Sequence, residues 1–141
     1  MQARATDSCV ANVLADAFNV REAWARALLV ELAATDSATA GTVAVKIGFK
    51  SRFALAHRLR CAALPPLTDL RAMMRVLTWT QHWKVEGTTL ARQAFREGRD
   101  PAVCYRMVRR VTGRGWRDFR GAEFAAVAVE LATRSRGGSA T

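Results

Sequence analysis

Two segments of the chain carry the same order of local signals: a short helix, a glycine, a polar turn and a second helix. The first copy, IGFKSRFALAHRLRCAALPPLTDLR, spans Ile47–Arg71, and the second, EGRDPAVCYRMVRRVTGRGWRDFR, spans Glu97–Arg120. They align from Gly48 and Gly98 once one residue is omitted from the turn after Gly98. A short helix, a turn containing glycine and a longer helix form the pattern of a helix-turn-helix. The repeat therefore predicts two such units in one chain.

The remainder of the chain also predicts helix, because Ala, Leu, Arg and Glu dominate and the alternation typical of strands is absent. We expect an all-α fold in which a long linker helix joins the two units and extra helices lie near both ends. The expected helices are one from Asp7 or Ser8 to about Phe18, Val20–Ala34 capped by Asn19, Thr42–Ile47, Arg52–Ala63 capped by Ser51, Asp69–Lys84 capped by Thr68, a short helix after Thr88 or Thr89, Pro101–Thr112, one opening at Trp116, and Gly121–Thr133.

Glycines follow several of these helix signals and are expected to end them. They are Gly48, Gly87, Gly98 and Gly113. On these boundaries we divide the chain into an N-terminal helical extension (1–19), a first helix-turn-helix subdomain with the linker helix (20–84), a second helix-turn-helix subdomain (85–133) and a disordered tail (134–141).

Positive charge is concentrated in the part of the chain that carries the repeat. Residues 46–120 hold a net charge of +12, whereas residues 1–45 hold −2 and the whole chain +10. A globular surface usually mixes its signs, so such a block favours an anionic partner, most commonly nucleic acid. A surface that only keeps the protein in solution is the alternative.

The helix expected from Pro101 separates into two faces. Its inner face is an apolar stripe at i, i+3, i+4 and i+7, formed by Cys104, Met107, Val108 and Val111. Its outer face is formed by Ala102, Tyr105, Arg106 and Arg109. Since an arginine can donate to both O6 and N7 of guanine, this outer face is suited to reading base edges.

The helix expected from Arg52 has a similar division. Its inner residues are Leu55, Leu59 and Ala62, and its outer residues are Phe53, Ala56, His57 and Arg60. Arg58 occupies an inner position, where we expect its stem to pack while its charged head reaches water or phosphate.

In these residues the chain resembles the AraC/XylS-type DNA-binding domain, in which a long helix joins two helix-turn-helix units. The resemblance covers about Val20–Arg120 and is carried by Val43-Ala44, Ile47-Gly48-Phe49, Leu55, Leu59-Arg60, Pro65-Pro66 and Leu70 in the first copy, and by Leu90, Ala94, Tyr105-Arg106, Arg109-Arg110, Thr112-Gly113 and Phe119-Arg120 in the second. It implies a transcription factor whose two recognition helices enter successive major grooves on one face of the duplex.

The resemblance and the two outer faces together supply the candidate site. Base contacts are expected from Arg52, Phe53, Ala56, His57, Ala102, Tyr105 and Arg106. Phosphate contacts, which position a protein on the duplex without reading its sequence, are expected from Lys50, Arg60, Arg109, Arg110, Arg114, Arg117 and Arg120.

The second copy departs from the family pattern around its turn. Glu97 and Arg99 stand where the family has apolar residues, Gln93 replaces an apolar core residue, and Trp116 occupies a position that is usually proline. The sequence leaves open whether the second unit reads bases or only clamps phosphates. Residues 1–45 could not build the effector-binding domain usual in the family, so we expect either a stand-alone regulator or part of a longer one.

Two other functions stay open at this point. The same basic surface would serve a non-specific architectural or RNA-binding protein. The apolar residues Trp24, Leu28, Leu29 and Leu32 would serve a helical protein–protein interaction module, or else pack on the rest of the chain. We expect double-stranded DNA as the partner, RNA polymerase as a further candidate partner, and a monomer, with a dimer through the N-terminal helices as the alternative.

The sequence carries no signal for catalysis, metal binding or a membrane span. It has no glycine-rich phosphate loop, nucleophile–base pair or carboxylate cluster, so we expect no enzyme activity and no cofactor. Cys9, Cys61 and Cys104 match neither a disulfide framework nor a zinc pattern and are expected to be buried or half-buried thiols. No apolar run approaches the roughly 20 residues of a membrane span, and no signal peptide is recognisable. We therefore expect a cytoplasmic, nucleoid-associated protein.

Overall fold

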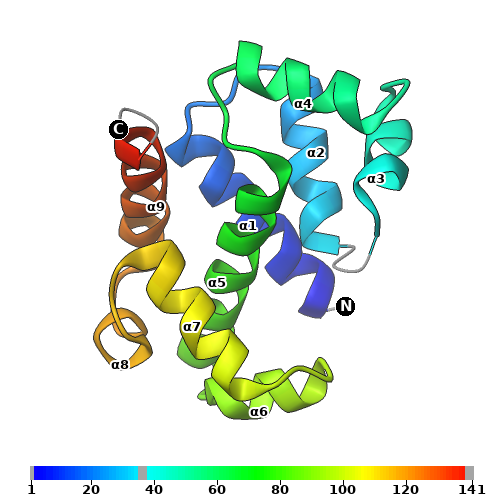
Figure 1. Ribbon diagram of the computed structural model, residues 1–141. Helices are drawn as coiled ribbons and strands as arrows, with labels where there is room; N and C mark the ends of the chain where they lie inside the picture. The colour runs from blue at the N-terminus through cyan, green and yellow to red at the C-terminus, as the bar shows by residue number, and fades with distance from the viewer. Residues whose placement is uncertain (1, 35–37, 139–141) are drawn as a thin grey trace.

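The computed structural model of the protein describes residues 2–34 and 38–138. Within these ranges the chain forms nine helices and no strand, which confirms the all-α prediction (Figure 1). The helices are α1 (Gln2–Ala17), α2 (Ala23–Ala34), α3 (Ala40–Ile47), α4 (Arg52–Cys61), α5 (Leu67–Glu86), α6 (Leu90–Arg96), α7 (Pro101–Thr112), α8 (Trp116–Phe119) and α9 (Phe124–Gly138).

The longest of these helices, α5, lies in the middle of the molecule (Figure 1) and packs against α1, α2, α6, α7 and α9. Buried residues recur at most of its positions between Leu70 and Thr80 and are not confined to one stripe. This pattern arises because other helices cover more than one side of α5. The helix therefore fixes the relative positions of the elements on either side of it.

The same turn occurs in both predicted units. Between α3 and α4, Gly48 adopts a φ of 108°, and the Phe49 N–H donates to the carbonyl five residues earlier at 2.9 Å. Between α6 and α7, Gly98 adopts a φ of 69°, and the Arg99 N–H makes the corresponding bond at 2.8 Å. A left-handed glycine at this position ends the helix and redirects the chain. The sequence alignment of the two copies thus pairs two glycines that are both left-handed and are followed by the same backbone hydrogen bond.

Side-chain caps fix the starts of the helices around these turns. Ser51 caps α4, as predicted, and Thr89, one of the two predicted candidates, caps α6; each accepts a backbone N–H at 3.2 Å. Pro101 occupies the first position of α7, as predicted, and Asp100 before it accepts the Ala102 N–H at 2.9 Å.

Two predicted helix starts in the N-terminal part are wrong. α1 already begins at Gln2, upstream of the expected cap at Asp7 or Ser8. Asn19 does not cap α2, because it adopts a left-handed φ of 57° after α1, and α2 begins only at Ala23. Asn is one of the few residues other than glycine that tolerates this conformation, so a residue suited to begin a helix here ends one.

Other boundaries also differ from the prediction. Thr68 does not cap α5, which begins at Leu67, two residues before the predicted Asp69. The N–H groups of Asp69 and Leu70 both donate to the Pro66 carbonyl at 3.0 Å, so the proline takes the cap position. α9 begins at Phe124 instead of Gly121 and covers residues 134–138 of the expected disordered tail, while residues 139–141 lie outside the described residues.

The apolar side chains of α2 are used inside the chain. Leu28, Leu29 and Leu32 are buried. Trp24 is half-buried and meets the edge of the Phe49 ring, with 5.5 Å between the ring centroids. These residues therefore pack on the rest of the chain, which was the alternative to an exposed interaction module.

The prediction of buried or half-buried thiols holds only for Cys104. Cys9 and Cys61 are exposed, because they lie on the outer sides of α1 and α4. Burial raises the pKa of the Cys104 thiol, and the nearby Glu97 carboxylate raises it further. Cys104 is thus a neutral core residue of α7.

Gly48→Ala is expected to lower the free energy of unfolding by about 1–2 kcal/mol, because a Cβ disfavours the left-handed conformation. The matched control is Gly41→Ala: Gly41 lies in α3, and an added Cβ there would meet no atom within 4 Å. The control is expected to raise the free energy of unfolding by about 0.5 kcal/mol. Urea unfolding followed by circular dichroism measures both, and two changes of the same sign would contradict the turn geometry.

Candidate nucleic-acid interface

α7 has the two faces that its sequence predicts. Cys104 and Val108 are buried, and Met107 and Val111 are half-buried beside them. The predicted outer residues are all exposed, namely Ala102, Tyr105, Arg106 and Arg109. The outer side of α7 therefore offers a phenol hydroxyl and two guanidinium groups to solvent.

α4 shows a similar division with one difference. Leu55 and Leu59 are buried, whereas Arg52, Phe53, His57 and Arg60 are exposed. Ala56, predicted to lie on the outer face, is half-buried, as is Ala62, predicted to lie inside. Phe53 has 70% of its surface exposed, and the Arg52 guanidinium lies 4.9 Å from its ring centroid. An exposed phenyl ring of this size does not serve the core and is available to a partner.

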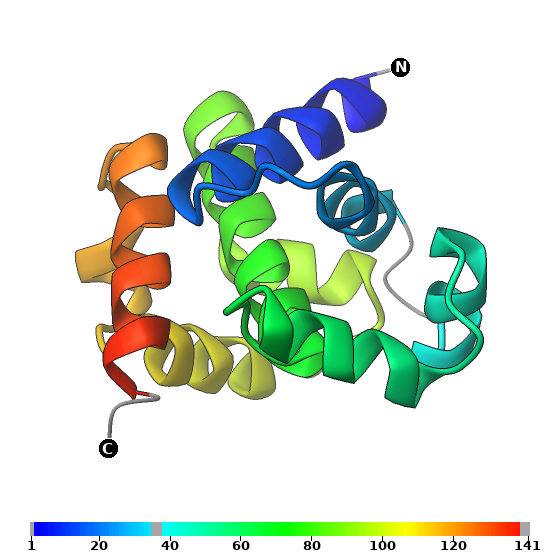
Figure 2. The ribbon, with the colours of Figure 1, turned by 90° about the horizontal axis from the view of Figure 1, so that it is seen from above.

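α4 and α7 lie on the same side of the molecule. Seen from above (Figure 2), both helices follow one edge of the fold, and α1 follows the opposite edge. They also run in the same general direction from Arg52 and Pro101 (Figure 1). The two helices are therefore neither back to back nor buried inside the fold.

Most of the predicted phosphate contacts are exposed around these two helices. The exposed residues are Lys50, Arg60, Arg109, Arg110 and Arg117. Arg60, at the end of α4, and Arg110, near the end of α7, line the same cleft between the two units. The fold thus brings cations of both units close together.

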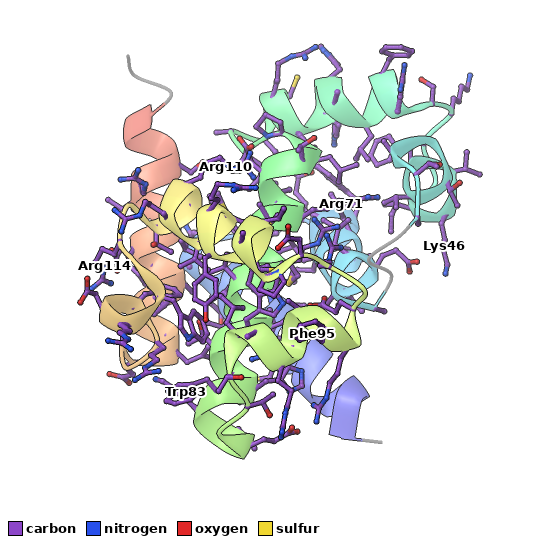
Figure 3. All side chains as sticks on the ribbon, turned by 60° about the horizontal axis from the view of Figure 1, so that its bottom comes forward. Lys46, Arg71, Trp83, Phe95, Arg110 and Arg114 are labelled. Carbon is purple, nitrogen blue, oxygen red and sulfur yellow. The ribbon has the colours of Figure 1, made fainter. Side chains whose placement is uncertain are left out.

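The other two predicted phosphate contacts, Arg114 and Arg120, are engaged within the protein. Arg114 lies in the turn after α7 (Figure 3), where its Nη2 donates to Glu130 Oε2 of α9 at 2.5 Å. The Arg120 guanidinium lies 4.3 Å from the ring centroid of Trp83, a stacking distance for a cation and an aromatic ring. Both side chains hold the region after α7 against its neighbours, and their contact with phosphate stays a prediction.

His57 has a partner on its own helix. Its Nε2 lies 3.6 Å from the Cys61 Sγ, one turn further along α4, and both side chains are exposed. Because the side chain is exposed, the imidazole is available for a hydrogen bond to a partner.

A cluster that the sequence did not reveal attaches α4 to the start of α2. Glu22 accepts hydrogen bonds from Trp24 Nε1 and from Arg58 Nη2, the latter at 3.4 Å. The Arg58 guanidinium lies 5.8 Å from the Trp24 ring centroid. The head of Arg58 therefore meets a carboxylate of the protein itself. The signal that could have indicated this was the odd position of Arg58 on the inner stripe.

Two of the polar departures in the second unit, Gln93 and Glu97, make hydrogen bonds with buried groups. Gln93 is buried, and its Nε2 donates to the carbonyls of Trp79 and Thr88 at 3.1 Å each. Glu97 Oε2 accepts the Trp79 Nε1–H at 2.8 Å. These bonds join α6 and the second turn to α5. The second turn is thus packed through polar contacts where the family pattern has apolar ones.

Residues 2–34 and 38–138 contain neither a metal-ligand cluster nor a membrane-spanning helix. No group of three or more His, Cys, Asp or Glu side chains in this part of the chain is placed to hold a metal ion. None of its helices has both the length and the apolar character needed to cross a membrane.

Neither a family model, nor a curated protein, nor a solved structure matches this chain. The resemblance to the AraC/XylS-type domain therefore stays a prediction, carried by the motifs.

Glu97→Ala is expected to lower the free energy of unfolding by about 1–3 kcal/mol, because it leaves the Trp79 Nε1–H without an acceptor. The indole is 1% exposed, so water cannot replace the lost acceptor without rearrangement. Glu97→Gln keeps an oxygen acceptor at this position, so it is expected to lower the free energy of unfolding by less than Glu97→Ala does. Urea unfolding measures both variants, and an equal loss in both would contradict a hydrogen-bonding role for Glu97.

Proposed function

We propose that the protein is a transcriptional regulator that binds double-stranded DNA sequence-specifically, with α4 and α7 as recognition helices in successive major grooves. The observation that carries the proposal is that α4 and α7 lie on one side of the molecule, each with most of its outer stripe exposed and its opposite stripe buried or half-buried. A helix fits the major groove, where every base pair offers a distinct pattern of donors and acceptors.

The proposed base contacts differ in chemistry between the two helices. On α7, Arg106 is suited to guanine, and the Tyr105 hydroxyl can donate or accept a hydrogen bond. On α4, Phe53 is suited to the methyl group of thymine, and His57 to a single polar base edge. The small side chains of Ala56 and Ala102 would let the helix backbones approach the bases closely. Arg52 completes the proposed set at the start of α4.

The proposed phosphate contacts surround these residues. The net charge of +12 over residues 46–120 supplies the long-range attraction to the duplex. Lys50, Arg60, Arg109, Arg110 and Arg117 are the exposed cations that would fix the register of the protein on the DNA. Two reading helices in one chain would cover two half-sites, so the proposal needs no dimer. It locates the protein at the nucleoid, in the cytoplasm, with RNA polymerase as a further proposed partner.

Selection of bound sites from a random duplex pool tests the proposal. Two preferred blocks about one helical turn apart are the expected outcome, since two recognition helices would read successive major grooves. A single block would mean that one unit only clamps phosphates. Equal binding to all duplexes, or tighter binding to RNA, would favour the non-specific architectural or RNA-binding alternative.

Arg106→Ala is expected to weaken binding to the selected site by about 1–3 kcal/mol and to relax the preference at one base pair, because the guanine contact is lost. Arg92→Ala removes the same charge from an exposed position of α6 outside the proposed interface and serves as control. Fluorescence anisotropy at one fixed salt concentration measures both. Unchanged affinity and preference in Arg106→Ala would show that this arginine does not read bases.

Arg117→Ala is expected to weaken binding to all duplexes alike and to reduce the slope of log K against log salt concentration by about 1, because one counterion fewer is released. The measurement is anisotropy over a series of salt concentrations, with the selected site and a random duplex side by side. A loss restricted to the selected site would assign Arg117 to base reading instead.

A further inference from the structure

A cleft of about 730 Å³ lies between the two units, on the side where α4 and α7 end. Its walls come from the end of α4, the connection from α4 to α5, the first turns of α5, the end of α7, and α9. The volume is in the range of sites for small organic molecules, roughly 300–1,000 Å³. None of the DNA contacts proposed above requires a cavity of this kind.

The floor of the cleft is apolar and fixed in position. Met73 and Leu131 are buried in the core beneath it, and Leu64 and Val111 are half-buried at its sides. The connection from α4 to α5 runs through Pro65-Pro66, whose rings restrict the backbone. The cleft therefore offers a preformed apolar surface that does not depend on a flexible loop.

Three cations from three different helices line the same cleft: Arg60 of α4, Arg110 of α7 and Arg134 of α9. Figure 3 shows the Arg110 side chain reaching from α7 toward the start of α5. Arg134 lies against Gly113, where a Cβ would be 2.7 Å from its Nη1. The lining contains one carboxylate, that of Asp69, so positive charge is in excess.

We propose that this cleft binds a small amphipathic anion, a molecule with an apolar body and one carboxylate or sulfonate group. The apolar body would lie on Met73, Val111 and Leu131. The anionic group would meet the guanidinium groups of Arg60, Arg110 and Arg134, since a planar guanidinium matches a carboxylate with two parallel hydrogen bonds.

Such a ligand would also touch the proposed DNA contacts. Arg60 and Arg110 belong both to the cleft and to the predicted phosphate contacts, so an anion bound here would compete with the duplex for them. This consequence rests on the proposed function, whereas the binding of the anion does not.

Two fluorescent probes with the same aromatic body test the proposal on the full chain without DNA. Anilinonaphthalene sulfonate carries the anionic group, and N-phenylnaphthylamine lacks it. The double variant Arg60→Gln, Arg110→Gln is expected to weaken the binding of the sulfonate probe by about tenfold or more, because charge-assisted hydrogen bonds are lost. Its affinity for the neutral probe is expected to stay unchanged. Arg117→Gln, which removes an exposed charge outside the cleft, is the control and is expected to change neither.

A filling variant locates the probes independently of charge. Val111→Trp is expected to weaken the binding of both probes, because the larger side chain fills part of the cleft. Circular dichroism checks that the helices are retained. Sulfonate binding that is unaffected by the arginine double variant, or equally affected by Arg117→Gln, would overturn the proposal. Because no DNA is present, this result is separate from the outcome of the site selection, and either proposal can fail alone.

Discussion

The burial of α5 on several sides is the constraint on which the positions of α4 and α7 depend. α7 and α6 pack directly on α5, so the second unit shares its core with the central helix. The first unit is attached less directly, because α4 packs on α3, α3 packs on α2, and α2 in turn packs on α5. α5 thus positions the exposed faces of both α7 and α4. It contacts α7 directly, whereas it reaches α4 through α2 and α3.

The contacts that attach the two units also differ in chemistry. The second unit is joined to α5 by hydrogen bonds of the buried side chains Trp79 and Gln93. The first is joined to α2 and the residue before it by two ion pairs, in addition to its apolar core. Arg58 pairs with Glu22 at 3.4 Å, where both side chains are exposed, and Lys46 pairs with the half-buried Glu31 at 2.9 Å. Exposed ion pairs contribute little to stability, typically below about 1 kcal/mol. Buried polar groups are costly to separate because water does not replace their partners.

Much of the fold could be predicted from the sequence because its signals are local. Gly48 and Gly98 end helices, Ser51 and Thr89 begin them, and the 3.6-residue period separates the faces of α7. Such rules act within one turn of a helix and need no knowledge of the rest of the chain. Where one residue suits two roles, the sequence could not decide: Asn19 is as well suited to end a helix as to begin one.

The candidate site could be predicted less completely, because its details depend on contacts between distant segments. The exposure of Tyr105 and Arg106 followed from helix periodicity alone. The engagement of Arg114 by Glu130, and of Arg120 by Trp83, joins residues whose proximity only the packing of α5, α7 and α9 creates. The cleft that Arg134 lines is likewise a product of tertiary structure, and no sequence motif marks it.

The indirect attachment of α4 makes the molecule unequal in stiffness. A force applied to α7 is resisted by the interior of the protein, where displacement would open close-packed contacts. A force applied to α4 is resisted partly by pairs such as Arg58 and Glu22, which dissolved ions screen. If two sites on a rigid partner are not spaced as α4 and α7 are, it is therefore α4 that shifts to fit them. This shift becomes easier as ionic strength rises.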